Sequence, residues 1–181
     1  MPKRVDHEER RRLISAAVRR IAADRGLEGV SLGEVAAEAG ISKGLVQHYF
    51  PTKDAMLRHA TATLRDQVRD RAAPTDLRSL LVSLLPLDAT ARSDALVATA
   101  FLVRALKDEE IAQRFRAGYA ELRSVLTALL AAEHPGCPDP GAEADLLLAV
   151  VTGLSDAVLL GHHSPAGALA LVDRHLARLS G

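Results

Sequence analysis

The chain has 181 residues and no net charge, with 48% hydrophobic and 25% charged residues, as in an ordinary globular protein. No apolar run reaches the roughly 18 residues of a membrane span. The charged N-terminus has no apolar signal segment, and Cys137 alone cannot form an internal disulfide, so we expect a cytoplasmic protein without membrane contact. Aromatic residues make up only 3%, so Ala, Leu and Val must build the core. Because Ala and Leu favour helices, we predict an all-α fold.

The zero net charge hides an asymmetry along the chain. Residues 1–72 carry 14 Lys and Arg against 10 Asp and Glu, whereas residues 73–181 carry 9 against 13. Clustered positive charge is typical of proteins that bind a polyanion, although a solvated helix face gives the same count.

The first predicted helix covers residues 7–25, where apolar residues recur at helical spacing opposite a face of Arg and Glu. The stretch SLGE at 31–34 predicts a capping box, in which Ser31 caps the Glu34 amide and Glu34 reaches back. The helix that follows should end at Gly40, because glycine is favoured just after a helix.

A second short helix is predicted directly after this one. Ser42 caps it, and Val46 and Phe50 lie four residues apart, so both should face inward. Thr52 then caps a longer helix that runs to about residue 71. Two short helices joined by a tight turn with glycine are typical of a helix-turn-helix, whose second helix can lie in the major groove of DNA.

The remaining faces of the second short helix are rich in hydrogen-bond donors. Cationic, amide, imidazole and phenol groups suit phosphates and base edges. The residues concerned are Lys43, Gly44, Leu45, Gln47, His48 and Tyr49. The same pattern also fits a helical corner in an enzyme or an adaptor whose polar face is merely solvated.

Residues 8–55 resemble the N-terminal domain of TetR-family transcriptional repressors. The resemblance lies in the amphipathic first helix, in GVSLGEVAAEAGISKG at 29–44 and in HYFPTKDAM at 48–56. It implies a ligand-responsive, sequence-specific regulator that binds a palindromic operator in double-stranded DNA as a homodimer. The alternative function is a helical protein–protein adaptor that does not bind DNA.

The resemblance also implies a domain order. We expect a helix-turn-helix DNA-binding domain at 1–51, a linker helix at 52–72, and an effector-binding and dimerisation domain at 73–181, with about nine helices in all. The C-terminal part resembles that of the subgroup that includes the choline/betaine regulator. Within 76–88 a short helix is predicted that ends at Pro86. The further predicted helices cover 89–107, 109–133, 142–161 and 166–179, the last with Ser164 as its cap and Pro165 at its first position.

Four residues are expected to contact phosphate without reading sequence. Tyr49 and Lys53 match the family's phosphate-contacting positions. Ser31 and Ser42 lie at helix N-termini, where backbone amides can meet a phosphate.

Base reading is expected from the start of the second short helix. Lys43 can donate to guanine, Gln47 can pair with adenine, Leu45 can rest on a thymine methyl, and Gly44 allows close approach. The family usually carries an aromatic residue at position 47 and a small or polar one at position 45. The operator of a relative therefore cannot be transferred to this chain.

Two further sites are expected in the C-terminal part. A small-molecule effector is predicted to contact Phe101, Arg104, Phe115 and Tyr119, although core packing explains each of these side chains equally well. The last two helices are predicted to pair with those of a second copy in a four-helix bundle. The apolar residues expected in that dimer interface are Leu147, Val150, Leu154, Val158, Leu169, Val172 and Leu176.

We expect neither enzymatic activity nor a metal or cofactor. The sequence has no phosphate-binding glycine loop, nucleophile elbow or paired carboxylates. His162 and His163 are adjacent and would point about 100° apart on a helix. Cys137 and His134 share a loop that offers no third ligand.

Overall fold

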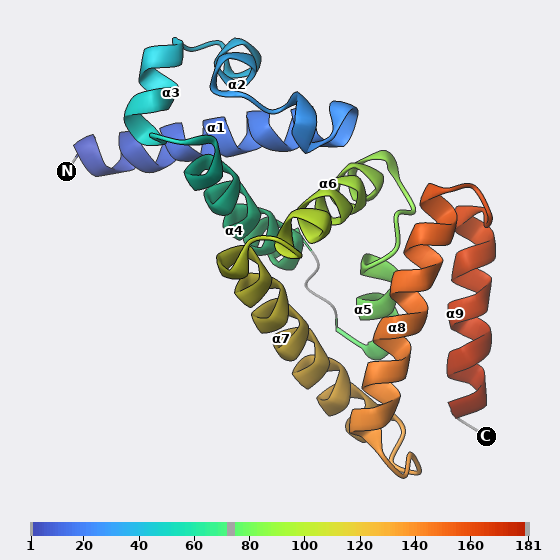
Figure 1. Cartoon of the computed structure of the whole chain (residues 1–181). Coiled ribbons are helices and arrows are strands. Elements are labelled where there is room, and N and C mark those ends of the chain that lie inside the picture. Colours follow the sequence, from blue (N-terminus) through green and yellow to red (C-terminus); the bar gives the residue numbers. More distant parts are fainter. Residues whose placement is uncertain (1, 72–74, 180–181) are drawn as a thin grey trace. The chain divides into compact units, whose positions relative to one another are not determined.

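The computed structural model describes residues 2–71 and 75–179, with the side chains of residues 7–62 and 75–179. Its described part contains nine α-helices and one short 3-10 helix, so the predicted all-α fold is confirmed (Figure 1). The elements are α1 (Pro2–Arg25), η1 (Leu27–Gly29), α2 (Leu32–Ala39), α3 (Lys43–Tyr49), α4 (Lys53–Arg71), α5 (Leu77–Ser83), α6 (Ala89–Ala105), α7 (Glu109–Glu133), α8 (Pro140–Leu159) and α9 (Pro165–Leu179).

The chain forms two compact units. Unit 1 comprises Met1–Val68 and Leu96–Arg114, and unit 2 comprises Arg69–Ala95 and Phe115–Gly181. The second half of α6 and the first turns of α7 therefore belong with the N-terminal helices. The domain boundaries expected from the sequence, at residues 51 and 72, stay a prediction.

In unit 1, each of the helices α1 to α4 contributes apolar side chains from one of its faces to the core. The turn between α2 and α3 depends on Gly40, whose φ of 65° lies in the left-handed region that favours glycine. The amides of Gly40 and Ile41 bond to carbonyls in the last turn of α2, which ends the helix there. The buried residues on α1 to α4 include Ile14, Ala17, Val18, Ile21, Val35, Val46, Met56, Leu57 and Ala60.

Several predicted helix ends agree with the structure and others do not. Helix α1 begins at Pro2 and not at residue 7, and the helix expected to end at Pro86 already ends at Ser83. Ser42 and Thr52 cap α3 and α4 through the amides of Leu45 and Ala55. Only one half of the capping box at 31–34 forms: Ser31 accepts from the Glu34 amide, but the Glu34 carboxylate lies 3.2 Å from Arg25 Nη1. The helix predicted at 142–161 begins earlier, at Pro140, because Asp139 caps it.

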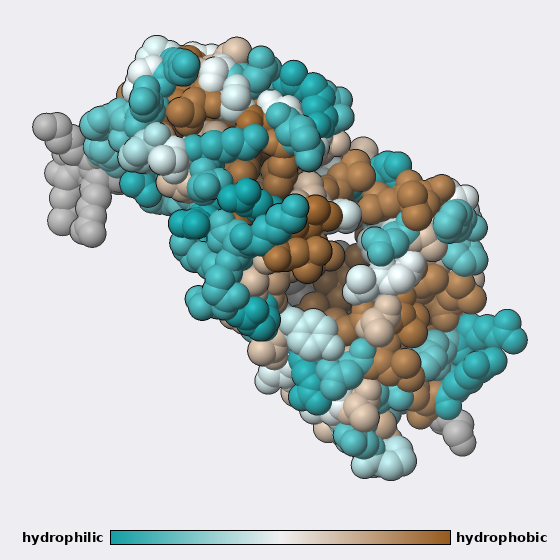
Figure 2. Space-filling view, viewed as in Figure 1, coloured by the Kyte–Doolittle hydropathy of each residue, from teal (hydrophilic) through white to brown (hydrophobic). Residues whose placement is uncertain are grey.

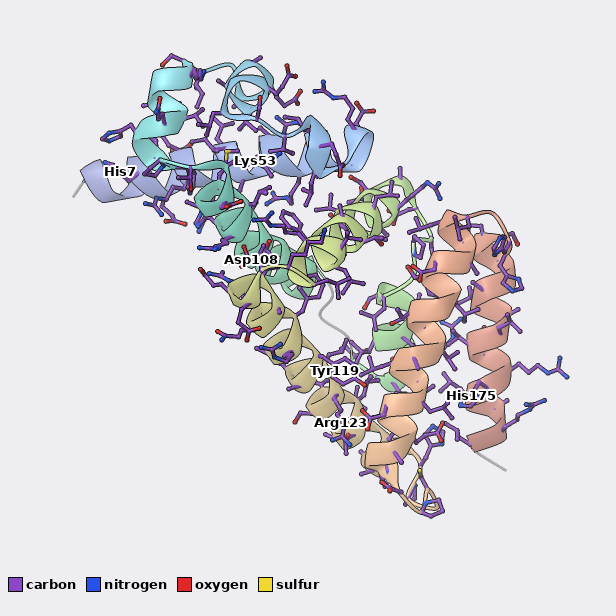
Figure 3. All side chains as sticks on the ribbon, in the orientation of Figure 1. His7, Lys53, Asp108, Tyr119, Arg123 and His175 are labelled. Atoms are coloured by element: carbon purple, nitrogen blue, oxygen red, sulfur yellow. The ribbon has the colours of Figure 1, made fainter. Side chains whose placement is uncertain are left out.

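An ion-pair cluster in unit 1 joins α4 to the turn between α6 and α7 (Figure 3). Arg58 Nε donates to Asp108 Oδ2 at 3.2 Å, and Arg58 Nη1 lies 3.1 Å from Glu110. Arg104 Nη2 donates to Asp54 at 2.7 Å and lies 3.6 Å from Asp108. Two positive and three negative side chains thus hold the first turns of α4 against the start of α7.

Asp108 is the most buried member of this cluster, with a side chain only 4% exposed. It also caps α7 by accepting from the Ile111 amide at 3.3 Å. Burial alone would raise its pKa, but the Ile111 amide and the Arg58 guanidinium outweigh burial, so the pKa of Asp108 lies below its usual value. The folded state therefore favours the ionised carboxylate.

The core of unit 2 is formed by α5, α8, α9 and the second half of α7. Leu77, Leu81, Leu126, Leu130 and Leu147 are nearly or fully inaccessible to solvent. At the surface of the same unit, Arg78 on α5 donates to Asp173 on α9 at 2.7 Å. Asp76 and Ser79 form a reciprocal capping box that fixes the start of α5. Searching the described residues reveals no helix long and apolar enough to cross a membrane.

We predict that Asp108→Asn lowers the free energy of unfolding at pH 7 by about 1–3 kcal/mol, because it removes charged partners of Arg58 and Arg104 but keeps a side chain able to cap α7. Because folding lowers the pKa of Asp108, its carboxylate stabilises the folded state at pH values above the usual pKa of 3.8. This contribution to the free energy of unfolding is lost as the pH falls from 3.8 through the lower pKa of the folded state. Urea denaturation at several pH values measures both effects.

The matched control is Asp24→Asn. Asp24 pairs with Arg25 at 3.6 Å, but its side chain is 79% exposed, so its loss should change stability by less than about 0.5 kcal/mol. Equal effects of the two substitutions would contradict a special role for the cluster.

Candidate functional site

Helix α3 presents an open polar face. Val46 is fully buried and Phe50, the residue that ends the helix, is 3% exposed. On the opposite side Lys43, Gly44, Gln47 and His48 are all exposed and form one continuous arc at 100° per residue. Leu45 and Tyr49 border this arc and are partly buried. The structure thus brings the six predicted α3 residues together on one helix surface.

Gly44 makes this surface accessible to a large partner. A Cβ atom added at Gly44 would meet no atom within 4 Å, so the helix backbone is uncovered at this point. Glycine is often found where the backbone must approach a ligand closely, because it has no side chain.

The Lys53 side chain does not extend freely into solvent, as we expected of a phosphate contact, but bonds to the protein itself. Its ammonium group donates to the carbonyl of Leu27 at 2.9 Å and thereby ties α4 to η1 (Figure 3). A lysine ammonium has three donors, so two remain for other acceptors. The hydrogen bond holds Lys53 in place beside the end of the helix-turn-helix.

Aromatic rings surround the C-terminal end of α3. His7, on α1, lies edge-on to Tyr49, with ring centroids 5.0 Å apart, and the His48 and Tyr49 centroids are 5.4 Å apart. The guanidinium of Arg11 lies over the ring of Phe50 at 5.4 Å. Sequence reasoning missed these contacts, because the contacting residues lie about 40 positions apart in the sequence and no local pattern links them.

His59, on α4, contacts the Phe50 ring, with centroids 5.2 Å apart. Burial, and then the positive charge of Arg11, lower the pKa of His59, with a smaller lowering from Arg114 and an opposing effect of Glu8. The neutral imidazole is therefore favoured next to Phe50.

The four residues expected to bind an effector fall into different units. Phe101 is fully buried in unit 1, and Arg104 is held by Asp54 and Asp108 there. These contacts favour a packing role for both side chains. Phe115 and Tyr119 lie on the part of α7 that belongs to unit 2, where Phe115 is partly buried and Tyr119 is 48% exposed.

Tyr119 belongs to a polar cluster that the sequence did not reveal (Figure 3). Its hydroxyl donates to Asp145 at 3.0 Å, and Arg123 Nε donates to the same carboxylate oxygen at 2.8 Å. The hydrogen bond to Asp145 raises the pKa of Tyr119, while Arg123 and then Tyr119 lower the pKa of Asp145. The cluster links α7 to α8 within unit 2.

The expected dimer residues divide into buried and accessible ones. Leu147, Leu154, Val158 and Val172 are at most 9% exposed and belong to the core of unit 2, whereas Val150, Leu169 and Leu176 are partly exposed. The same helices expose Leu146 at 49% and Leu171 at 40%, and Leu160, the residue that ends α8, is 71% exposed. Figure 2 shows apolar surface over α8 and α9 next to hydrophilic side chains.

A shallow groove of about 400 Å³ lies on the surface formed by α8 and α9. Its apolar lining comes from Val150, Leu154 and Leu171, and its polar lining from Arg174, His175 and Arg178. His175 Nε2 lies 2.8 Å from Glu143. Within the described part of the chain, no three His, Cys, Asp or Glu side chains are placed to hold a metal ion.

Two family profiles match adjacent parts of the chain. Residues 13–60 match the profile of bacterial regulatory proteins of the tetR family, and residues 73–181 match that of the C-terminal domain of BetI-type transcriptional repressors. Curated relatives include the HTH-type transcriptional regulator PksA of Bacillus subtilis, which is 43% identical over 81 residues, covering 45% of this chain and 40% of PksA. BetI of Burkholderia mallei is 43% identical over 102 residues, covering 56% of this chain and 49% of BetI.

Solved structures share the fold over nearly the whole chain, whereas the matches to these two curated relatives span less than half of each relative. A transcriptional regulator from Rhodococcus sp. Rha1 is 33% identical, with a TM-score of 0.84 over 93% of this chain and 95% of the other. A regulator from Saccharomonospora viridis, solved in complex with choline, has a TM-score of 0.83 over 94% and 95% of the two chains. Its 22% identity supports a common fold alone.

Proposed function

Because the chain belongs to the TetR family of bacterial regulatory proteins and carries a BetI-type C-terminal domain, we propose that it is a ligand-responsive transcriptional repressor. It binds a palindromic operator as a homodimer. We place it in the cytoplasm, where a bacterial regulator meets the chromosome. The observation that carries this proposal is the uncovered polar face of α3, with Lys43, Gly44, Gln47 and His48 exposed around a buried Val46. The relatives are named as transcriptional regulators and not as enzymes, as the sequence led us to expect.

Base reading is assigned to the exposed arc of α3. Lys43 donates to guanine O6 or N7, Gln47 pairs with the adenine edge, and Leu45 contacts a thymine methyl. The open space beside Gly44 supports this assignment, because it lets the helix enter the groove closely. Each such contact needs a fixed helix, which the buried Val46 and Phe50 provide.

Phosphate contacts are assigned to the edges of the helix-turn-helix. Tyr49 and Lys53 donate from the end of α3 and the start of α4, while Ser31 and Ser42 mark the N-terminal ends of α2 and α3, where backbone amides can meet phosphate. The Lys53 ammonium bridges the Leu27 carbonyl and a phosphate with different donors. These contacts position the protein on any duplex without selecting a sequence.

We predict different effects for the two kinds of contact. Gln47→Ala should cost about 1–3 kcal/mol on the operator and relax preference at one base pair in each half-site. Lys53→Met should weaken all duplexes alike and lower the salt slope by about one unit. Fluorescence anisotropy on the operator and on an unrelated duplex, at several salt concentrations, measures both.

Lys53→Met also removes the hydrogen bond to Leu27, so thermal unfolding of this variant serves as a control for folding. A Gln47→Ala protein with unchanged sequence preference would contradict the assigned readout. An unaltered protein without salt-dependent affinity for any duplex would favour the adaptor function.

Dimerisation is assigned to the surface of α8 and α9 that carries Leu146, Val150, Leu171 and the groove between the two helices. A side chain added at Gly153, on the same surface of α8, would meet no atom within 4 Å of its Cβ. The small Gly153 and Ala157 therefore allow the helices of a second copy to approach closely. Pairing of two such helix pairs around a two-fold axis makes a four-helix bundle.

We predict that Gly153→Glu abolishes the dimer and leaves the protomer folded. The substitution removes glycine from a helix interior, which should stabilise the helix by up to about 1 kcal/mol. In the dimer the new carboxylates would be buried beside the two-fold axis. Sedimentation equilibrium at micromolar concentration measures the mass, with Ala131→Glu at an exposed position of α7 as the control. A dimeric Gly153→Glu protein, or a monomeric unaltered one, would rule out this interface.

A small-molecule effector is assigned to the part of α7 that carries Phe115 and Tyr119. Helix α7 also supplies Glu110 to the cluster that holds Arg58 of α4, so a ligand that displaces α7 would act on α4 and hence on α3. The ligand must bind better when the protein cannot bind DNA, and a coupling of roughly 1–3 kcal/mol is typical. The neighbour with bound choline shows that this fold can hold a small molecule.

We predict that Phe115→Ala reduces release from DNA by an effector but keeps operator affinity within about twofold, since Phe115 belongs to unit 2 and the α3 surface to unit 1. Choline and a panel of small organic cations and acids are the first compounds to screen, using operator release as the readout. If Phe115→Ala weakens operator binding as much as the effector response, it is a residue of the core.

A further inference from the structure

His7 and Arg11 lie one turn apart on α1, and each contacts an aromatic ring at the end of α3. The His7 ring lies 5.0 Å from the Tyr49 ring, at an interplanar angle of 62°, and 6.4 Å from the His48 ring. Arg11 lies over Phe50 at 5.4 Å. The start of α1 is therefore in contact with three successive residues at the C-terminal end of α3.

The side chains in these contacts differ in how far they are exposed to solvent. Phe50 is buried and has a fixed ring, whereas Tyr49 is only partly buried, and His7 and His48 are exposed. In tyrosine the whole aromatic ring separates the hydroxyl from the backbone, so a rotation of the side chain moves the Tyr49 hydroxyl far. Without neighbours the side chain would sample several rotamers, and fixing it on binding would cost conformational entropy. His7 and His48 each meet the Tyr49 ring edge-on, which is a favoured geometry for aromatic pairs.

We propose that His7 is a positioning residue for the phosphate contact of Tyr49. The inference rests on the proposed function, in which the Tyr49 hydroxyl donates to a phosphate oxygen of the operator. His7 holds the phenol ring in one orientation before DNA arrives, so that the hydroxyl does not have to be ordered on binding. Because Tyr49 contacts phosphate, the contribution of His7 is the same on every duplex sequence.

A double-mutant cycle between His7 and Tyr49 tests this role. Duplex affinity is measured by fluorescence anisotropy for the unaltered protein, His7→Ala, Tyr49→Phe and the double variant, on the operator and on an unrelated duplex. His7→Ala should weaken both complexes about two- to tenfold, the range expected for loss of one aromatic pair. In the Tyr49→Phe background, where the hydroxyl is missing, His7→Ala should have no further effect.

His7→Phe distinguishes positioning by the ring from direct contact by the imidazole. It keeps an aromatic edge beside Tyr49 and should bind both duplexes within about twofold of the unaltered protein. His162→Ala, which removes an exposed histidine from unit 2, is the matched control and should change nothing. Thermal unfolding tests that each variant is folded, which we expect because His7 and His162 are exposed and Tyr49→Phe keeps the aromatic ring.

Three results would overturn the inference while leaving the proposed function intact. His7→Ala could bind as well as the unaltered protein, its cost could persist in the Tyr49→Phe background, or His7→Phe could bind as weakly as His7→Ala. In the last two cases His7 would contact DNA or support the fold by itself. An unaltered protein that binds no duplex would remove the proposed function and this inference with it.

Discussion

The burial of Val46 and Phe50 is the constraint on which the rest of the site depends. Because these residues are four apart, burying both fixes the rotation of α3 about its axis, and every other side chain of the helix follows from that rotation. A seven-residue helix has little stability of its own, so its position comes from these anchors and from its contacts with α1 and α2. Specific contacts to base edges require such rigid support.

The same reasoning connects α3 to the rest of the chain. Phe50 contacts both Arg11 of α1 and His59 of α4, so the end of α3 depends on the placement of both helices. Helix α4 is in turn held by Arg58 and Asp54 in the cluster around Asp108. Within unit 1, α4 is thus tied to the start of α7 by ion pairs of Arg58 and to the end of α3 by the neighbouring residue, His59.

Local sequence signals predicted most of the fold and the composition of the α3 face. Ser42 and Thr52 cap their helices as expected, and the inward placement of Val46 and Phe50 followed from their spacing. What the sequence could not supply were contacts between distant residues. The pairs Arg58–Asp108 and Arg20–Glu38 are 50 and 18 residues apart, and no periodicity relates their members.

Apolar spacing also could not decide which side of a helix meets its own core and which meets a partner. On α8 and α9, Leu147, Val158 and Val172 fill the core of unit 2, while Leu146 and Leu171 are exposed. Both groups are equally apolar, so only the packed structure separates them. The same limit applies to Phe101, whose burial in unit 1 was as consistent with the sequence as a ligand contact.

Selection of bound sequences from a pool of random duplex DNA, with the unaltered full chain, tests the central claim most directly. The account predicts enrichment of an inverted repeat, because two identical α3 helices related by a two-fold axis must read the same half-site on opposite strands. Enrichment of no sequence, at a salt concentration where the protein still binds duplex DNA, would contradict sequence reading by α3.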